Sequence, residues 1–207
     1  MTTNPQVQRT KKWLFDSLMD LMKTKPFRKI TVQDIVRGAG LSRSAFYSHY
    51  TSKEDILREK VQEYQNEYVD LSLSSPQQSQ FENWKKTVVA YQKHSDFYIQ
   101  MYRNDLVALI SNAEFENYSG TISLVSQTLG DKSPEDPDLY YGAYMHYHRP
   151  AQIKLILEWL DDGCKTSVDE ITALVASIAC INVYNEFRKD YLHNLSLLSS
   201  QEVIAAQ

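Results

Sequence analysis

Apolar residues recur at every third or fourth position through almost the whole chain, and this is the spacing of an amphipathic α-helix. Glycine and proline number only six each among the 207 residues, and they fall where the periodic segments end. The sequence has no run of alternating apolar and polar residues bounded by hairpin turns. It therefore predicts an all-α fold, with a small N-terminal helical head followed by a larger helical body.

The start of the head carries two clear helix signals. A first helix is expected over residues 10–22, after a flexible polar tail at residues 1–8, and it should end before Pro26. Thr31 is followed three residues later by Asp34, which is the spacing of a capping box. A second helix should therefore begin at Thr31.

Two short helices joined by a Gly-Leu-Ser turn are the central feature of the head. The second helix should end at residues 38–40, because glycine readily adopts the left-handed conformation that closes a helix. Ser42 is expected to cap a third helix that runs to about His49, and Thr51 with Glu54 to cap a fourth that starts near residue 52. This turn lets the third helix project while the second braces it, so the third can enter a major groove.

Charge is divided unevenly along the chain. Residues 1–60 hold 12 Lys and Arg against 6 Asp and Glu, a net charge of +6, whereas the remainder has a net charge of −10. A basic module on an acidic body is typical of a protein whose head alone binds phosphates. The predicted outward face of the third helix carries side chains that donate to bases or phosphates: Ser42, Arg43, Ser44, Tyr47 and His49.

The body is expected to follow a polar linker at residues 72–80. Helices are predicted at residues 81–101, 104–112, 114–129, 138–161 and 168–193, with a kink or a split at Pro150. The last helix has a face of small residues, the helix before it has an apolar stripe, and two such helices from each chain would form a four-helix dimer interface. The residues assigned to that interface are Ile153, Ile156, Leu157, Leu160, Ala173, Ala176, Ser177, Cys180 and Tyr184.

Two alternatives for the body remain open from the residues. Beside the small-residue face, the last helix should pack on the body of its own chain through Ile171, Leu174, Val175, Ile178 and Ile181. Both interface stripes could instead fill the core of a single chain. Most of the body's tyrosines are expected to pack in the core with the hydroxyl reaching water. A few could line an effector cavity, and the candidates are Tyr98, Tyr102, Tyr141 and Tyr144.

Several classes of protein lack their usual signals. The two cysteines have no CxxC spacing, which indicates a reducing cytoplasm and neither a disulfide framework nor a zinc site. His146 and His148 are two apart, so on a helix they point away from each other and cannot share a metal. The sequence has no membrane span, secretion signal, glycine-rich phosphate loop or nucleophile elbow. We therefore expect no enzymatic activity, cofactor, metal or membrane partner.

Residues 9–58 resemble the TetR/AcrR family of bacterial regulators. The resemblance rests on three stretches at fixed spacing, which are ITVQDIV at 30–36, AGLSRSAFYSHY at 39–50 and SKEDIL at 52–57. It implies that Thr31, Tyr47 and Lys53 contact phosphates and that Ser42, Arg43, Ser44 and His49 face the groove. His49-Tyr50 stands where the family more often has a basic or aromatic residue followed by Phe.

The resemblance also implies how such a protein works. It implies a DNA-binding domain at residues 9–58, with the fourth helix linking from about residue 52 to a dimerisation and effector-binding domain at 72–207. The segments 155–163 and 167–171 resemble the C-terminal body of Firmicutes members. We expect a cytoplasmic homodimer that binds a palindromic operator in double-stranded DNA, as a repressor that a small-molecule effector releases. The alternative is a co-regulator of the same fold that acts by recruiting another protein.

Overall fold

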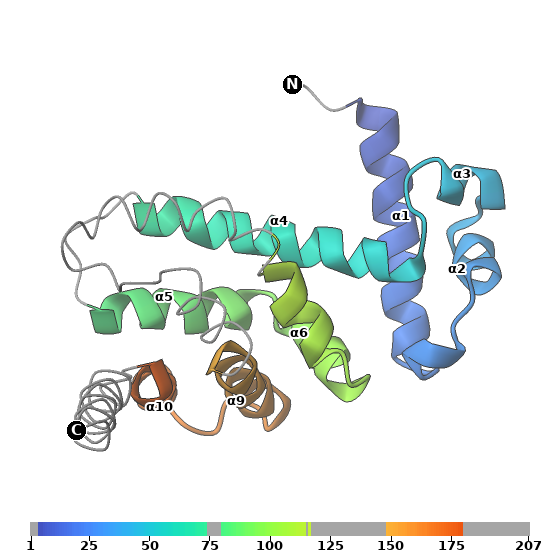
Figure 1. The fold of residues 1–207 in the computed structure, drawn as a ribbon. Coiled ribbons are helices and arrows are strands. Elements are labelled where there is room, and N and C mark those ends of the chain that lie inside the picture. The colour runs from blue at the N-terminus through green and yellow to red at the C-terminus, as the bar shows by residue number, and fades with distance from the viewer. Residues whose placement is uncertain (1–3, 74–79, 115, 117–147, 180–207) are drawn as a thin grey trace, which may run out of the picture.

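The computed structural model describes residues 4–73, 80–114, 116 and 148–179, and every element among them is helical, with no strand in these ranges (Figure 1). The all-α prediction is confirmed. The head contains α1 (Pro5–Met22), a short 3-10 turn η1 (Phe27–Lys29), α2 (Val32–Ala39), α3 (Arg43–Tyr47) and the start of α4 (Lys53–Leu73). The body contains the rest of α4, then α5 (Gln80–Lys93), α6 (Ser95–Arg103), a helical stretch at 107–114, α9 (Arg149–Asp161) and α10 (Val168–Ala179).

Helix α1 begins five residues earlier than expected, so the second half of the predicted flexible tail is helical. The Asn4 side chain accepts a hydrogen bond of 3.0 Å from the Gln6 backbone N–H, which satisfies one of the free donors at a helix start. Pro5 fits at this position because it has no N–H to satisfy and its φ is already helical. Leu14 and Leu18, both 0 % exposed, then anchor α1 in the core of the head.

Helix α2 begins and ends as its sequence predicts. The Thr31 hydroxyl accepts a bond of 3.1 Å from the Asp34 N–H, and the Asp34 carboxylate accepts one of 3.0 Å from the Thr31 N–H. Gly40 closes the helix with a left-handed φ of 66°. Gly38 permits close packing on α1, because a Cβ built there would lie 2.3 Å from the Ser17 Oγ.

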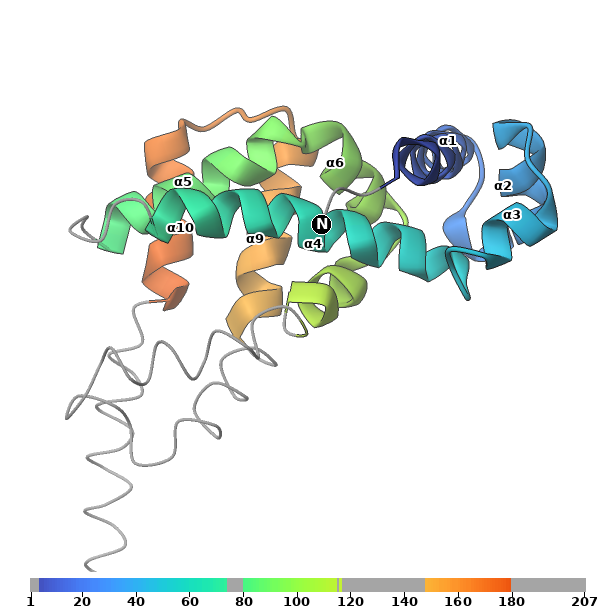
Figure 2. The same ribbon diagram turned by 90° about the horizontal axis from the view of Figure 1, so that it is seen from above.

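The start of α4 depends on Asp55 rather than on the expected Glu54. One carboxylate oxygen of Asp55 accepts hydrogen bonds from the Thr51 N–H (2.9 Å), the Thr51 hydroxyl (2.6 Å) and the Ser52 N–H (2.8 Å). Burial would raise the pKa of Asp55, but these bonds outweigh it and lower that pKa to about 2. Helix α4 then continues for 21 residues from the head into the body, without a break at residue 58 (Figures 1 and 2).

Of two helix boundaries in the body, one differs from the prediction and one agrees with it. The single helix expected over 81–101 is divided at His94, where α5 ends and α6 begins. Pro150 lies in the first turn of α9, which agrees with the predicted split, because the N–H groups of a first helical turn have no acceptor within the helix. The parts of the predicted helices at 117–129, 138–147 and 180–193 lie outside the described residues.

The apolar stripe of α9 packs inside its own chain, which corrects its assignment to a dimer interface. Ile153, Ile156 and Leu157 are each 0 % exposed and Leu160 is 3 % exposed, because α6 and α10 cover this face. The stripe therefore belongs to the protomer core, which was the open alternative. Figure 2 shows α9 and α10 side by side, crossing behind α4.

On α10 the small-residue face is open, as the interface prediction requires. Ala173 and Ser177 are exposed and Ala176 is half-buried. Ile171 and Val175 are buried as expected, but Leu174 is 52 % exposed and does not pack on the body. It joins the open face instead. Cys180 and Tyr184, together with the predicted packing residue Ile181, lie outside the described residues.

Candidate nucleic-acid interface

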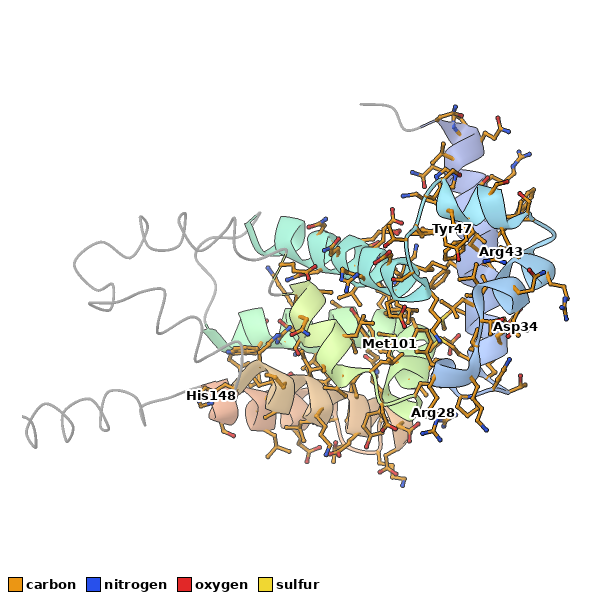
Figure 3. The ribbon with its side chains drawn as sticks, turned by 45° about the vertical axis from the view of Figure 1, so that its right-hand side comes forward. Arg28, Asp34, Arg43, Tyr47, Met101 and His148 are labelled. Carbon is orange, nitrogen blue, oxygen red and sulfur yellow. The ribbon has the colours of Figure 1, made fainter. Side chains whose placement is uncertain are left out.

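Helix α3 is held by its inward aromatic side chains and presents the opposite side to solvent. Figure 3 labels Arg43 and Tyr47 on this helix. The Ser42 hydroxyl caps the helix by accepting a bond of 3.1 Å from the Ala45 N–H. Phe46 is 0 % exposed, and Tyr50 just beyond the helix is 7 % exposed, so both anchor it to the head. The predicted outward residues Ser42, Arg43, Ser44 and Tyr47 are all exposed, and His49 is partly exposed. The structure thus places these five residues at one surface.

Arg43 and Tyr47 form a pair on that surface. The Arg43 guanidinium carbon lies 5.8 Å from the centre of the Tyr47 ring, and the ring itself is 50 % exposed. An arginine over an aromatic face is attracted by the ring's quadrupole and loses part of its rotational freedom. Such a pre-oriented guanidinium is suited to a bidentate hydrogen bond with a guanine edge or a phosphate.

Two other predicted phosphate contacts have structural bonds in the head. The Thr31 hydroxyl caps α2, at the exposed N-terminal end of that helix. The Lys53 ammonium donates to the backbone carbonyls of Phe27 and Ile30, both at 2.7 Å, and lies 4.4 Å from the centre of the Phe27 ring. Lys53 therefore ties the first turn of α4 to η1. The resemblance to the family implies that Lys53 contacts a phosphate of DNA, and the sequence did not predict its bonds to the carbonyls of Phe27 and Ile30.

A further network fixes the end of α3 and was not predicted. Glu59 of α4 accepts hydrogen bonds of 2.6 Å from both the Tyr50 hydroxyl and the Lys11 ammonium. Burial and the nearby carboxylate of Glu59 raise the pKa of Tyr50 well above its ordinary value. Burial would raise the pKa of Glu59, but the bonds from Lys11 and Tyr50 lower it overall. The only signal in the sequence is Tyr50 itself, a hydroxyl where the family more often has Phe.

The head meets the body at Asn104, which follows α6. The Asn104 carbonyl oxygen accepts a bond of 2.7 Å from the Phe27 N–H, and its amide donates to the Gln100 carbonyl at 2.9 Å and to the Met22 carbonyl at 3.5 Å. These residues line a groove of about 680 Å³ between η1 and the end of α6. One side chain therefore joins the α1–α2 connection to the body.

The interior of the body holds a buried ion pair. Glu114 is 3 % exposed, and its carboxylate accepts from Arg149 Nε (2.7 Å), from an Arg149 terminal nitrogen (3.1 Å) and from the Tyr91 hydroxyl (2.6 Å). Tyr98, a predicted effector residue, is 3 % exposed and stacks on Tyr91 with ring centres 4.2 Å apart. Burial raises the pKa of both tyrosines.

The remaining predicted effector residues lie apart from this ion pair or cannot be placed. Tyr102 is half-buried, and its hydroxyl donates to the Glu158 carboxylate at 3.3 Å. Tyr141 and Tyr144 lie outside the described residues. The described part of the chain has no group of three or more His, Cys, Asp or Glu side chains that could hold a metal ion. It also has no helix that is long and apolar enough to cross a membrane.

A short exposed helix braced by a second helix across a glycine turn defines a helix-turn-helix head. The family model described as "Bacterial regulatory proteins, tetR family" matches residues 14–59, which span α1 to the start of α4. The head of this chain is therefore similar to the DNA-binding heads of the TetR family.

Two curated relatives are similar to the chain over short stretches. The HTH-type transcriptional regulator EthR of Mycolicibacterium smegmatis is 49 % identical over 37 residues, or 18 % of this chain. The uncharacterized HTH-type transcriptional regulator YxbF of Bacillus subtilis is 33 % identical over 66 residues, or 31 % of this chain. The aligned stretches span 17 % of the length of each relative.

Two solved structures are similar over most of the chain. Lin0861 from Listeria innocua matches 86 % of this chain and 93 % of its own, with a TM-score of 0.63 and 16 % identity. A TetR transcriptional regulator from Streptococcus agalactiae matches 84 % of this chain and 94 % of its own, with a TM-score of 0.53 and 19 % identity. At these identities the likeness shows the fold: a TetR-type head on a larger helical body.

Proposed function

We propose that this chain is a sequence-specific DNA-binding transcription regulator that reads an operator with α3. The observation that carries the proposal is the outward face of α3, where Ser42, Arg43, Ser44 and Tyr47 are exposed on a helix anchored by buried Phe46. The net charge of +6 over residues 1–60 attracts the phosphate backbone to this head. Thr31 and His49 complete the proposed set, while Lys53 holds the first turn of α4 against η1.

The direct test is selection of bound sequences from random double-stranded DNA with the purified full chain, followed by a mobility shift on the selected site. A regulator of this kind enriches one sequence and binds it alone. Enrichment of no sequence, or binding only after another protein is added, would contradict the proposal and favour a co-regulator.

Arg43 provides a sharper test of how the operator is read. If its guanidinium contacts a guanine edge, Arg43→Ala should weaken binding to the selected site by about 1–3 kcal/mol and affect random DNA less. The matched control is Arg28→Ala, which removes an exposed arginine from η1 instead of α3. Equal losses on the selected site and on random DNA would assign Arg43 to the backbone.

We further propose that the protein acts in the cytoplasm as a homodimer on a palindromic operator. The open face of α10, with Ala173, Leu174 and Ser177 exposed, is the surface that supports this. Twofold symmetry would present two copies of α3 to successive turns of the major groove. Selected sequences that lack twofold symmetry would contradict the dimer.

Release of DNA by a small-molecule effector in the body completes the proposed function, with repression as the outcome of binding. The support is the polar interior around Glu114, Arg149 and Tyr98, because a ligand that competes for such groups shifts helices that also pack against α4. A screen of metabolites by melting temperature, with operator affinity measured for each hit, tests this. A stabilising compound that leaves operator affinity unchanged would count against it.

A further inference from the structure

We propose that the first half of α1 forms a second DNA contact, in which Arg9 and Trp13 lie on the sugar-phosphate backbone that flanks the site read by α3. This inference rests on the proposed DNA-binding function. It concerns residues that lie before the family match, which begins at residue 14, and that the resemblance does not name as DNA contacts.

The first observation is the exposure of Trp13. Its side chain is 46 % exposed, and the large apolar side chains exposed in the described part of the head are Trp13 and Tyr47. Each has an arginine over its ring: Arg9 lies 6.0 Å from the Trp13 ring and Arg43 lies 5.8 Å from the Tyr47 ring. The tryptophan ring is apolar while its N–H donates a hydrogen bond, so an exposed Trp13 beside Arg9 can pack on a sugar and bond to a phosphate.

The second observation is where the two residues lie. Ser17, one turn beyond Trp13, donates to the Ile35 carbonyl of α2 at 2.8 Å, and Lys25 pairs with Asp34 at the start of α2 at 2.6 Å. The two helices are therefore antiparallel, and Trp13 lies toward the end of α2 that leads into α3. Arg9 lies one turn further, about 6 Å along the axis. In Figure 1 the N-terminal turns of α1 extend past the level of α3.

The third observation is charge. Residues 1–15 contain Arg9, Lys11 and Lys12 and no acidic residue. Lys11 pairs with Glu59 and Lys12 with Asp16, whereas no acidic side chain among the described residues pairs with Arg9. Its guanidinium is a planar donor that matches the two oxygens of a phosphate.

DNA is the occupant that these observations favour over an acidic protein. An α3 helix in the major groove brings a phosphate strand along each wall of that groove. In homeodomains, another family of three-helix DNA-binding heads, the arm before the first helix enters the adjacent minor groove, so the N-terminal part of such a head can contact DNA beside the recognition helix. An indole packed on a sugar with an arginine on the neighbouring phosphate contributes affinity without reading bases.

The first test uses Arg9→Ala, with Lys23→Ala as the control, because Lys23 is an exposed cation at the opposite end of the same helix. Binding is measured on a duplex cut to the selected core and on one extended by about one helical turn (~10 base pairs) on each side. On the extended duplex we expect Arg9→Ala to bind about tenfold more weakly. The slope of the logarithm of the binding constant against the logarithm of salt concentration should be smaller in magnitude by about 0.9 per head. On the core duplex it should match wild type, and Lys23→Ala should match wild type on both.

The outcomes separate this inference from the function on which it rests. Wild type that binds neither duplex contradicts the proposed function. Wild type and Arg9→Ala that bind the extended duplex equally overturn the α1 contact alone. An equal loss on both duplexes also overturns it, because the contact then does not lie in the flank, and so does a loss seen only when another protein is present.

A second measurement does not depend on affinity. The chain has three tryptophans, and Trp13 is the one in the head, so Trp84→Phe with Trp159→Phe leaves Trp13 as the reporter. Iodide should quench its fluorescence in the free protein and quench it severalfold less once the extended duplex is bound. The core duplex should give little protection. Quenching that is unchanged by the extended duplex would overturn the proposal. If the double variant fails to fold, Trp13→Ala in the affinity assay gives the same decision.

Discussion

Replacing Lys53 decides between two roles for one residue. The sequence places Lys53 on a phosphate, whereas the structure directs its ammonium to the carbonyls of Phe27 and Ile30 at 2.7 Å each. Lys53→Met keeps the methylene chain against the Phe27 ring and removes only the charge and its donors. The two roles then give opposite results in two assays.

The expected loss of stability follows from the bonds that disappear. A hydrogen bond from a charged group contributes about 1.5–3 kcal/mol when it is shielded from water. Lys53 is only partly buried, so water can reach the two carbonyls in the variant and replace much of that energy. We therefore expect Lys53→Met to lower the free energy of unfolding by about 2 kcal/mol in total.

Urea unfolding measures this loss, with Lys12→Met as the control. Lys12 forms an ion pair with Asp16 in which its side chain is 72 % exposed, so its replacement should change stability by less than about 0.5 kcal/mol. The salt dependence of operator binding gives the second reading. If Lys53 stays on the carbonyls, the slope should change by much less than the value of about 0.9 expected for one lost phosphate contact. Unchanged stability together with a full change in slope would refute the structural role.

Three further predictions concern the body, the recognition helix and the dimer. Arg149→Met should lower the free energy of unfolding by about 3–5 kcal/mol, because it leaves the Glu114 carboxylate buried without the arginine's charge. Thermal melts measure this loss, and a value below about 1 kcal/mol would contradict the prediction. Tyr50→Phe removes only the hydroxyl bonded to Glu59, so the loss in free energy of operator binding should exceed the loss in free energy of unfolding. Binding equal to wild type in mobility shifts would show that this bond does not position α3. Ser177→Glu puts a charge on the open face of α10, so it should give a folded monomer by sedimentation and circular dichroism, whereas a variant that stays dimeric would move the interface elsewhere.

Local signals in the sequence predicted the head well, for a physical reason. A capping box needs only the side chains of Thr31 and Asp34 and the backbone between them, so its spacing is sufficient evidence. The same holds for Gly40, whose left-handed φ follows from the residue type. The outward face of α3 follows from the helical period once Phe46 is assigned to the core.

Contacts between distant residues could not be predicted in this way. The period of α9 shows that Ile153 and Ile156 share an apolar face, but it does not say whether the same chain or a partner covers that face. The division at His94 also leaves the periodicity intact on either side, so 81–101 reads as one helix. Neither feature has a residue pattern of its own.

The contacts that were missed are also the ones that determine where α3 lies relative to the body. Glu59 joins the end of α3 to α1 across 48 positions from Lys11, and Asn104 joins the α1–α2 connection to α6 across 77 positions from Phe27. The chain itself crosses from head to body through the unbroken helix α4. A movement of α6 relative to α4 must therefore be taken up at the Asn104 bonds or transmitted to the head. The local sequence builds the reading surface, while these long-range bonds hold that surface in a fixed position on the body.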